Sequence, residues 1–261
     1  MKIVVCIKQV PDTTEVKLDP KTNTLIRDGV PSIINPDDKA GIEAALRLKE
    51  QTNGHVTVVC MGPGQADVAL REALAMGCDE AILLSDRAFG GSDTYATATV
   101  IAGGLKTLDY DVIITGRQAI DGDTAQVGPQ IAEQLHIPQV SYAEELKVDG
   151  DSLIVKRQFE DRYQMIKVHT PCLITALSEL AKPRYMTVSG IVDAYEKEVK
   201  VLGFEDLKNN FDPANIGLKG SPTNVYKSFT KQAKGAGTIL NVTPDEAVQA
   251  IMDKLIEKHI I

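Results

Sequence analysis

The chain has 261 residues, of which 43% are hydrophobic and 25% are charged, the composition of an ordinary globular protein. Its net charge of −8 argues against a nucleic-acid-binding or anionic-membrane surface, either of which needs clustered Lys and Arg. No apolar run approaches the ~20 residues of a membrane-spanning helix, so we expect no membrane insertion.

The first half of the sequence alternates apolar strand patterns with amphipathic helix patterns. Strands are predicted over 2–8, 55–62, 81–85, 111–115 and 138–146. Helices are predicted over 37–51, 65–77, 92–108 and 125–135, the third with Ser92 or Asp93 as its N-cap. Near-continuous Val, Ile and Leu strands between helices are typical of a parallel sheet covered on both faces. The sequence therefore predicts an α/β fold with a doubly wound, mostly parallel sheet.

The pattern changes after residue 146. Residues 146–176 alternate apolar and polar side chains around a Val-Asp-Gly-Asp turn, which predicts an antiparallel hairpin added to the sheet. Residues 208–237 are rich in Asn, Gly, Pro and Lys and favour an extended arm. Residues 244–260 then form a strong amphipathic pattern behind a Thr243 cap. An arm that ends in such a helix must fold back or dock on another chain to bury its apolar stripe.

Several kinds of site are not expected. The four cysteines form no CxxC pair and the four histidines are scattered, which favours free buried thiols and no metal site. The dinucleotide fingerprint GxGxxG, the P-loop and the GxSxG nucleophile motif are all missing. Asp121 and Asp123 have the spacing of paired carboxylates, but acids two apart in a loop more often bind backbone donors. We therefore expect no catalytic side chain.

Four loops at strand ends are candidates for ligand binding, because ligands of open parallel sheets lie beyond the carboxyl ends of the strands. They are 6–16, 34–41, 60–67 and the long loop within TGRQAIDGDTAQVG (115–128). Their glycines and helix starts could offer backbone N–H groups to phosphates. Asn-Pro-Asp or Gly-Pro-Gly alone would more often be a plain turn. Together the loops predict a nucleotide-binding α/β module.

Five segments in their order resemble the β subunit of electron-transfer flavoproteins. They are VVCIKQV, INPDDKAGIEAALRLKE, CMGPGQADVALREALAMG, TGRQAIDGDTAQVGPQIAE and LAKPRYMTVSGIV, which together span roughly residues 2–195. The resemblance implies a Rossmann-like, adenine-nucleotide-binding domain over 1–180 and a partner-recognition loop over 181–195. It also implies a C-terminal arm and helix over 196–261 that dock on an α subunit.

The resemblance also implies a nucleotide site. In the family the β subunit's nucleotide is AMP in the simple mitochondrial type and a second FAD in the electron-bifurcating type of anaerobic bacteria and archaea. Segments 35–38, with Cys6 and Met61, would line the adenosine end, and 116–127 would hold the pyrophosphate and ribose. The implied binding residues are Cys6, Asn35, Pro36, Asp37, Asp38, Met61, Gly116, Arg117, Gln118, Ala119, Ile120, Asp121, Gly122, Asp123, Thr124, Ala125, Gln126 and Val127.

Two stretches are similar to the bifurcating type, namely DGDTAQVGP in the long loop and FGGSDTYATA at 89–98. Thr13 and Asp37 stand where the AMP-binding type has a tyrosine and another aromatic residue, and smaller side chains there would leave room for a second flavin and NADH. Ser92, Asp93 and Thr94 are further candidates for contacts with NADH or that flavin.

The segment PRYMTVSGI (183–191) matches the family's recognition loop, which docks on an acyl-CoA dehydrogenase. Tyr185, Met186, Val188 and Ile191 would contact the partner, with Val188 in place of the family's anchoring leucine. A Val anchor buries about one CH₂ less, worth ~0.8 kcal/mol. The alternative is that Met186, Val188 and Ile191 pack on their own subunit.

The implied function is that of a cytoplasmic bacterial or archaeal electron-transfer flavoprotein. FAD on this subunit would accept hydride from NADH, and the electrons would divide between the α-subunit FAD with its acyl-CoA dehydrogenase and ferredoxin or flavodoxin. The heterodimer would thus be an NADH-oxidising flavoprotein that reduces ferredoxin. One alternative is a non-bifurcating β subunit with structural AMP. Another is a nucleotide-sensing stress protein with a similar α/β core.

Overall fold

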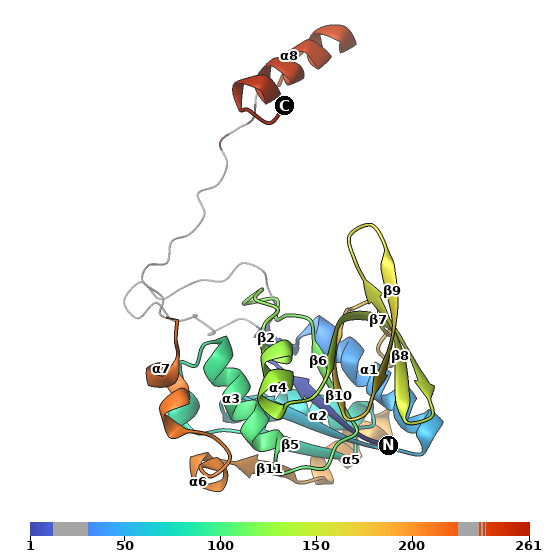
Figure 1. The fold of residues 1–261 in the computed structure, drawn as a ribbon, viewed down its shortest axis with the longest axis vertical. Helices are drawn as coiled ribbons and strands as arrows, with labels where there is room; N and C mark the ends of the chain where they lie inside the picture. The colour runs from blue at the N-terminus through green and yellow to red at the C-terminus, as the bar shows by residue number, and fades with distance from the viewer. Residues whose placement is uncertain (13–30, 224–234, 236, 238) are drawn as a thin grey trace. The chain divides into compact units, whose positions relative to one another are not determined.

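The computed structural model describes residues 1–12, 31–223, 235, 237 and 239–261, so Thr13 lies outside the described residues. The chain divides into two units, Met1–Asn224 and Val225–Ile261. The first unit holds the sheet and most of the helices (Figure 1). Within the described residues, no helix is both long and apolar enough to cross a membrane.

The described part of the first unit is built on a nine-stranded sheet in the order β11-β5-β4-β1-β6-β10-β7-β8-β9. Neighbours from β11 to β7 run parallel, and β7, β8 and β9 form an antiparallel meander. The strands are β1 (Lys2–Ile7), β4 (His55–Met61), β5 (Glu80–Leu84), β6 (Val112–Gly116), β7 (Gln139–Asp149), β8 (Ser152–Gln158), β9 (Tyr163–His169), β10 (Cys172–Ala176) and β11 (Val199–Leu202). A separate antiparallel pair joins β2 (Gln9–Pro11) to β3 (Ser32–Ile34).

Helices cover both faces of this sheet, which confirms the predicted doubly wound α/β fold (Figure 1). One apolar core contains side chains of α1 (Pro36–Thr52), α2 (Asp67–Met76) and α5 (Val188–Glu196). The other contains side chains of α3 (Thr94–Leu105), α4 (Val127–Leu135) and α6 (Phe204–Leu207). The single turn α7 (Gly217–Gly220) and the 3₁₀ turns η1 (Gly64–Ala66), η2 (Arg87–Phe89) and η3 (Pro213–Asn215) complete the unit.

The order of the strands reverses at β1. From β1 the chain builds outward through β4 to β5, then returns to place β6 on the other side of β1. The connections after β1 and β6 therefore leave in opposite directions and open a crevice beyond the carboxyl ends of these two strands. This is where the predicted nucleotide loops converge.

The region 146–176 contains more than the predicted hairpin. The meander is antiparallel as expected, but Cys172–Ala176 forms β10, which lies between β6 and β7 and is parallel to both. All five residues of β10 are buried. A continuous apolar run such as CLITA is typical of a strand covered on both faces, and this distinguishes it from the alternating residues before it.

The region after 181 also contains more secondary structure than the predicted loop and arm. Val188 begins helix α5, capped by Thr187 Oγ1, which accepts from the N–H of Gly190 (3.0 Å). Leu207 and Ile216 are buried against the α3 face of the core. A few apolar anchors thus hold an otherwise polar stretch on the first unit as far as Thr223. Much of the predicted arm, 224–234 with 236 and 238, lies outside the described residues.

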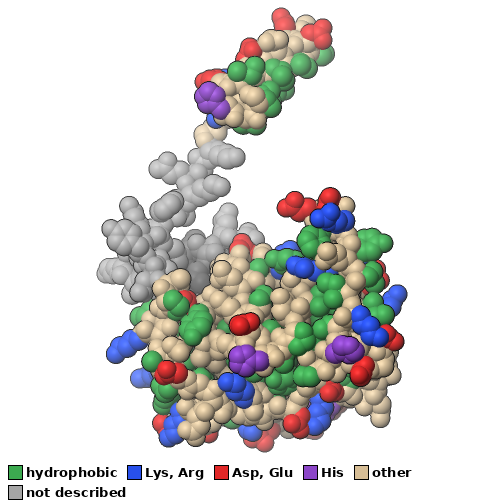
Figure 2. Space-filling model, in the orientation of Figure 1, with side chains coloured by type: hydrophobic (Ala, Val, Ile, Leu, Met, Phe, Trp, Pro, Cys, Tyr) green, Lys and Arg blue, Asp and Glu red, His purple; other side chains and the backbone are tan. Residues whose placement is uncertain are grey.

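The second unit contains α8 (Pro244–Glu257), close to the predicted helix 244–260. The Glu246 carboxylate accepts from the backbone N–H of Thr243 at 2.9 Å, which fixes the helix start. Apolar side chains gather along one side of this helix (Figure 2). Val248, Ile251 and Ile256 on it are all more than half exposed.

Candidate functional site

A cavity of about 800 Å³ lies at the carboxyl ends of β1, β4, β5 and β6. This volume is within the ~300–1,000 Å³ range of small-molecule and cofactor sites. Four stretches of the chain contribute to its wall: 6–9, 60–66, 84–94 and 115–128. The crevice expected at the reversal point of the sheet is therefore a real pocket.

The carboxylate of Asp38 joins three elements at the floor of this cavity. Its oxygens accept from the backbone N–H of Gly116 (2.9 Å), the backbone N–H of Lys8 (2.7 Å) and Nδ2 of Asn35 (3.1 Å). Burial raises the pKa of Asp38 to about 7, although these three hydrogen bonds oppose the rise. A Cβ at position 116 would overlap Asp38 Oδ1, so the close approach requires glycine there.

The first half of the long loop is held from behind. Asn35 donates through Nδ2 to the carbonyl of Gln118 (2.8 Å) and accepts at Oδ1 from the N–H of Ile120 (3.0 Å). Lys8 Nζ donates to Asp121 Oδ1 at 2.6 Å, and the Asp121 side chain is only 2% exposed. These polar pairs fix the first half of the loop.

The second half of the loop, 122–128, is open toward the cavity. Asp123 (φ 51°) and Ala125 (φ 53°) both adopt the left-handed conformation, which is uncommon for side-chain-bearing residues. Among the described residues, the backbone N–H groups of 124–128 have no acceptor, and no side chain caps α4. Unpaired N–H groups at a helix start offer a ready site for an anionic group such as a phosphate. A Cβ at Gly122 would meet nothing within 4 Å.

The remaining wall combines an apolar lobe with two cations. Leu84, Phe89 and Ile101 line the side toward β5 and α3. Arg87 and Arg117 bring positive charge to the wall. Arg117 Nε is buried without a hydrogen bond among the described residues and lies 3.5 Å from Asp37 Oδ2. The cavity can thus receive both a flat apolar group and an anionic group.

Two buried thiols, Cys6 and Cys60, also line the cavity. Burial raises the pKa of Cys60 to about 12 and raises that of Cys6 further still. Both side chains are therefore neutral at pH 7 and act as small apolar surface. Among the described residues no cluster of His, Cys, Asp or Glu has the geometry of a metal site.

Ser92, Asp93 and Thr94 all line the cavity, but their polar side-chain atoms have partners within the chain. Ser92 Oγ donates to the carbonyl of Phe89 (2.8 Å). Asp93 caps α3 by accepting from the N–H of Ala96 (3.0 Å), which resolves the two predicted caps in favour of Asp93. Thr94 Oγ1 donates to Gln126 Oε1 (3.0 Å) and so connects the α3 start to the long loop.

Most of the predicted binding residues come together in the cavity wall. Those that line it are Cys6, Asp38, Met61, Gly116, Arg117, Gln118, Ala119, Gly122, Asp123, Thr124, Ala125, Gln126 and Val127. Five of the predicted residues do not line it, namely Asn35, Pro36, Asp37, Ile120 and Asp121. Sequence reasoning missed the exit of β5, namely Ser85, Asp86 and Arg87, although the strand-exit rule applies there as well.

The predicted partner segment lies beside α1 and α2. Tyr185 and Val188 are 94% and 82% exposed, and Met186 and Ile191 are each 40% exposed. The exposure of Val188 argues against the alternative that it packs on its own subunit, whereas Met186 and Ile191 are partly covered by it.

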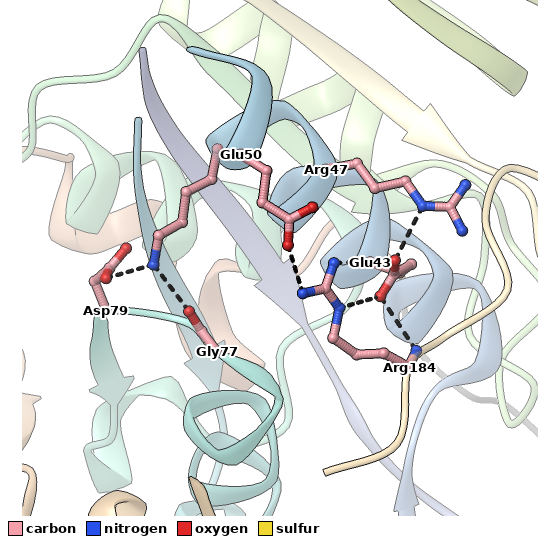
Figure 3. A network of polar contacts seen from close by, with 7 residues as sticks. Glu43, Arg47, Glu50, Gly77, Asp79 and Arg184 are labelled. Carbon is pink, nitrogen blue, oxygen red and sulfur yellow. Dashed lines mark hydrogen bonds and ion pairs between the residues drawn. The ribbon is translucent and has the colours of Figure 1, made fainter. Parts of the chain in front are cut away.

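Arg184 anchors the start of this segment (Figure 3). Its backbone N–H and Nε donate to Glu43 Oε2 at 3.2 and 2.8 Å, and its Nη1 donates to Glu50 Oε1 at 2.7 Å. Hydrogen bonds to these two carboxylates raise the pKa of the Arg184 guanidinium. At the far end of the segment, Arg71 Nη1 donates to the carbonyl of Ala194 (2.7 Å). The exposed apolar side chains are thus carried on a segment fixed at both ends.

Comparison with known proteins gives a family match over most of the chain. A model of the electron transfer flavoprotein domain matches residues 22–207. The chain is 58% identical to the electron transfer flavoprotein subunit beta of Clostridium acetobutylicum, with all of both chains covered. It is 53% identical to subunit CarD of the caffeyl-CoA reductase-Etf complex of Acetobacterium woodii. It is 52% identical to the electron transfer subunit gamma of acryloyl-CoA reductase from Anaerotignum propionicum, and both chains are again fully covered in each case.

Proposed function

The chain belongs to the electron transfer flavoprotein family as a β subunit, and we propose that its cavity binds FAD for electron bifurcation from NADH. The observation that carries this proposal is the extent of the cavity. Its wall runs from the open loop 122–128 to the apolar lobe of Leu84, Phe89 and Ile101. An AMP molecule would need only the loop and adenosine end, whereas the additional apolar lobe fits the flat ring system of a flavin.

The residues present fit such a cofactor. The unpaired N–H groups of 124–128 would bind the pyrophosphate and ribose, and Cys6 and Met61 would line the adenosine end. Asp38, Asn35 and Lys8 would hold the loop in place from behind. Asp121 and Asp123 are loop organisers in this account, since each accepts a hydrogen bond from a neighbouring side chain.

A bound FAD would supply the redox chemistry by accepting hydride from NADH and releasing its two electrons singly, one toward the α-subunit FAD and an acyl-CoA dehydrogenase, the other toward ferredoxin or flavodoxin. The chain's own residues bind and orient the cofactor and exclude water from it. Thr94 and Thr97, on the cavity side of α3, line the place where NADH would approach. In this mechanism no side chain of this subunit acts as a nucleophile or as an acid or base.

The partners follow from the family and from two exposed apolar surfaces. A β subunit implies an α subunit, and α8 with its exposed apolar side is the part of the predicted arm that would dock there. The relatives that serve a caffeyl-CoA reductase and an acryloyl-CoA reductase favour a dehydrogenase-type partner. Tyr185, Met186, Val188 and Ile191 would contact that partner.

The proposal is tested by purifying the heterodimer and adding NADH under anaerobic conditions. Bleaching of the flavin spectrum is expected, together with reduction of ferredoxin that depends on an acyl-CoA acceptor. Electron transfer only from dehydrogenases, with no reduction by NADH, would instead identify a non-bifurcating β subunit.

A further inference from the structure

Residues 217–223 close against the cavity rim at the stretch that leads into α3. The N–H of Leu218 donates to the carbonyl of Gly90 (3.0 Å). Ser221 Oγ accepts from the N–H of Asp93 (2.8 Å) and donates to the carbonyl of Gly217 (2.8 Å). Thr223 is the last described residue of the first unit, beyond which the chain continues into the second unit.

The two oxygens of Asp93 serve different elements. Oδ1 accepts from the N–H of Ala96 and caps α3 (3.0 Å). Oδ2 accepts from both the N–H (2.9 Å) and the Oγ1 (2.6 Å) of Thr223. Burial acts to raise the pKa of Asp93, but the hydrogen bonds from Ala96 and Thr223 hold it below its usual value. The side chain is therefore a carboxylate at neutral pH and can accept from both elements at once.

The same stretch is part of the cavity wall. Gly91, Asp93 and Thr94 line the cavity, and Thr94 is hydrogen-bonded to Gln126 of the open loop. A ligand in contact with residues 91–94 and 122–128 would therefore touch the same stretch that holds Thr223. Of the contacts between residues 217–223 and this rim, the carboxylate of Asp93 is the one that reaches Thr223, where the chain leaves toward its second unit.

We propose that Asp93 is a positioning residue through which FAD binding in the cavity and fixation of the chain's exit at Thr223 stabilise each other. This inference rests on the proposed FAD site. Since coupling between two equilibria is reciprocal, fixation of the exit at Thr223 raises FAD affinity by the same factor by which bound FAD stabilises that fixation.

The test is hydrogen–deuterium exchange on the α–β heterodimer, emptied of nucleotide at this cavity and then titrated with FAD. In the wild type, FAD is expected to slow exchange of the Thr223 amide about tenfold, within the ~5–150-fold range of typical couplings. In Asp93→Asn one oxygen can still cap α3, but the amide nitrogen then faces the donors of Thr223. FAD-dependent slowing at Thr223 is expected to disappear, and the Kd for FAD is expected to rise about five- to tenfold.

Two further variants separate coupling from general damage. Thr223→Val removes only the Oγ1 donor and should give an intermediate loss of slowing. Asp212→Asn is the control. Asp212 caps η3 by accepting from the N–H of Ala214 (2.9 Å) and does not line the cavity. This variant should therefore behave as wild type.

Two results would overturn the coupling: an FAD affinity that is unchanged in Asp93→Asn, or a wild-type Thr223 amide that exchanges at the same rate with and without FAD. A heterodimer that holds AMP in this cavity overturns the proposed FAD function but not the coupling, which is then measured with AMP by the same two readouts. The failures of the two proposals are therefore distinguishable.

Discussion

Asp38 accepts the backbone N–H of Gly116 at 2.9 Å, although 78 residues separate them in the sequence. This hydrogen bond joins the start of α1 to the end of β6 at the floor of the cavity. Because the long loop leaves from Gly116, its direction depends on the place of the Asp38 carboxylate. The relationship leads to the first two predictions.

Gly116→Ala is expected to displace Asp38, because the new Cβ would overlap Oδ1. Overpacking of this kind costs about 1–3 kcal/mol, and the loop should lose its nucleotide. Thermal unfolding and nucleotide content after gel filtration measure both effects. Gly122→Ala is the matched control. Its Cβ would meet no atom of the chain within 4 Å, so stability should be unchanged. Because Gly122 lines the cavity, the added methyl group should still lower nucleotide affinity. Equal stability of the two variants would refute the assigned role of Gly116.

Asp38→Asn is expected to change how stability depends on pH. The pKa of Asp38 is about 7 in the folded chain, against 3.8 ordinarily. Between these values the folded chain retains a proton that the unfolded chain releases, so this group's contribution to the free energy of unfolding falls as pH rises from about 4 to 7. Asparagine at position 38 does not titrate in this range. The difference in free energy of unfolding between wild type and variant should therefore narrow from pH 5 to pH 7 and then level off. Urea unfolding at several pH values measures the gap, and a gap independent of pH would contradict the assignment.

Glu43→Gln is expected to loosen the partner segment. The Glu43 side chain is 5% exposed and accepts from Arg184 and Arg47. A glutamine there turns a buried amide N–H toward these donors and leaves it unpaired, at a cost of about 1–3 kcal/mol. The rate of electron transfer to the dehydrogenase should fall while FAD content stays constant. Glu50→Gln is the control, because that exposed ion pair with Arg184 is worth at most about 1 kcal/mol. An equal effect of both variants would show that the Glu43–Arg184 pair has no special role.

Val188→Asp is expected to slow electron transfer to the dehydrogenase at least tenfold, because a charge replaces an exposed apolar side chain on the surface proposed to contact that partner. Val188→Ala should give a smaller loss, corresponding to two fewer methyl groups. Oxidation of NADH with an artificial acceptor measures flavin function independently and should not change. Val201→Asp places the same charge on another exposed valine, on β11, and should leave the dehydrogenase rate intact.

The fold was largely predictable because its signals are local. Apolar runs such as Val112–Gly116 and glycine-containing helix ends occur within single elements, and their bounds agree with the structure to within a few residues. The place of β10 was not predictable from alternation, since insertion of Cys172–Ala176 between β6 and β7 is a tertiary choice. The stretch from 208 looked like an arm because its composition is polar, yet the buried side chains of Leu207 and Ile216 anchor it to the first unit.

The position of the cavity was predictable, but the long-range hydrogen bonds that hold its wall were not. Glycines and strand exits identified the loop at 116–128, and the structure places the loop in the cavity wall. Pairs such as Lys8 with Asp121, 113 residues apart, leave no local pattern. The cap that Asp93 provides for α3 was among the predicted ones, but its second bond, to Thr223 130 residues away, was not predictable. Such side-chain partnerships depend on which loops the sheet order brings together.

The central claim is that this cavity holds FAD and that NADH reduces it. The most direct measurement is the nucleotide content of the purified heterodimer, by chromatography of the released cofactors, followed by anaerobic titration with NADH. We expect two FAD per heterodimer, no AMP, and full bleaching of the flavin absorbance by NADH. One FAD with one AMP, and a flavin spectrum that NADH leaves unchanged, would contradict it.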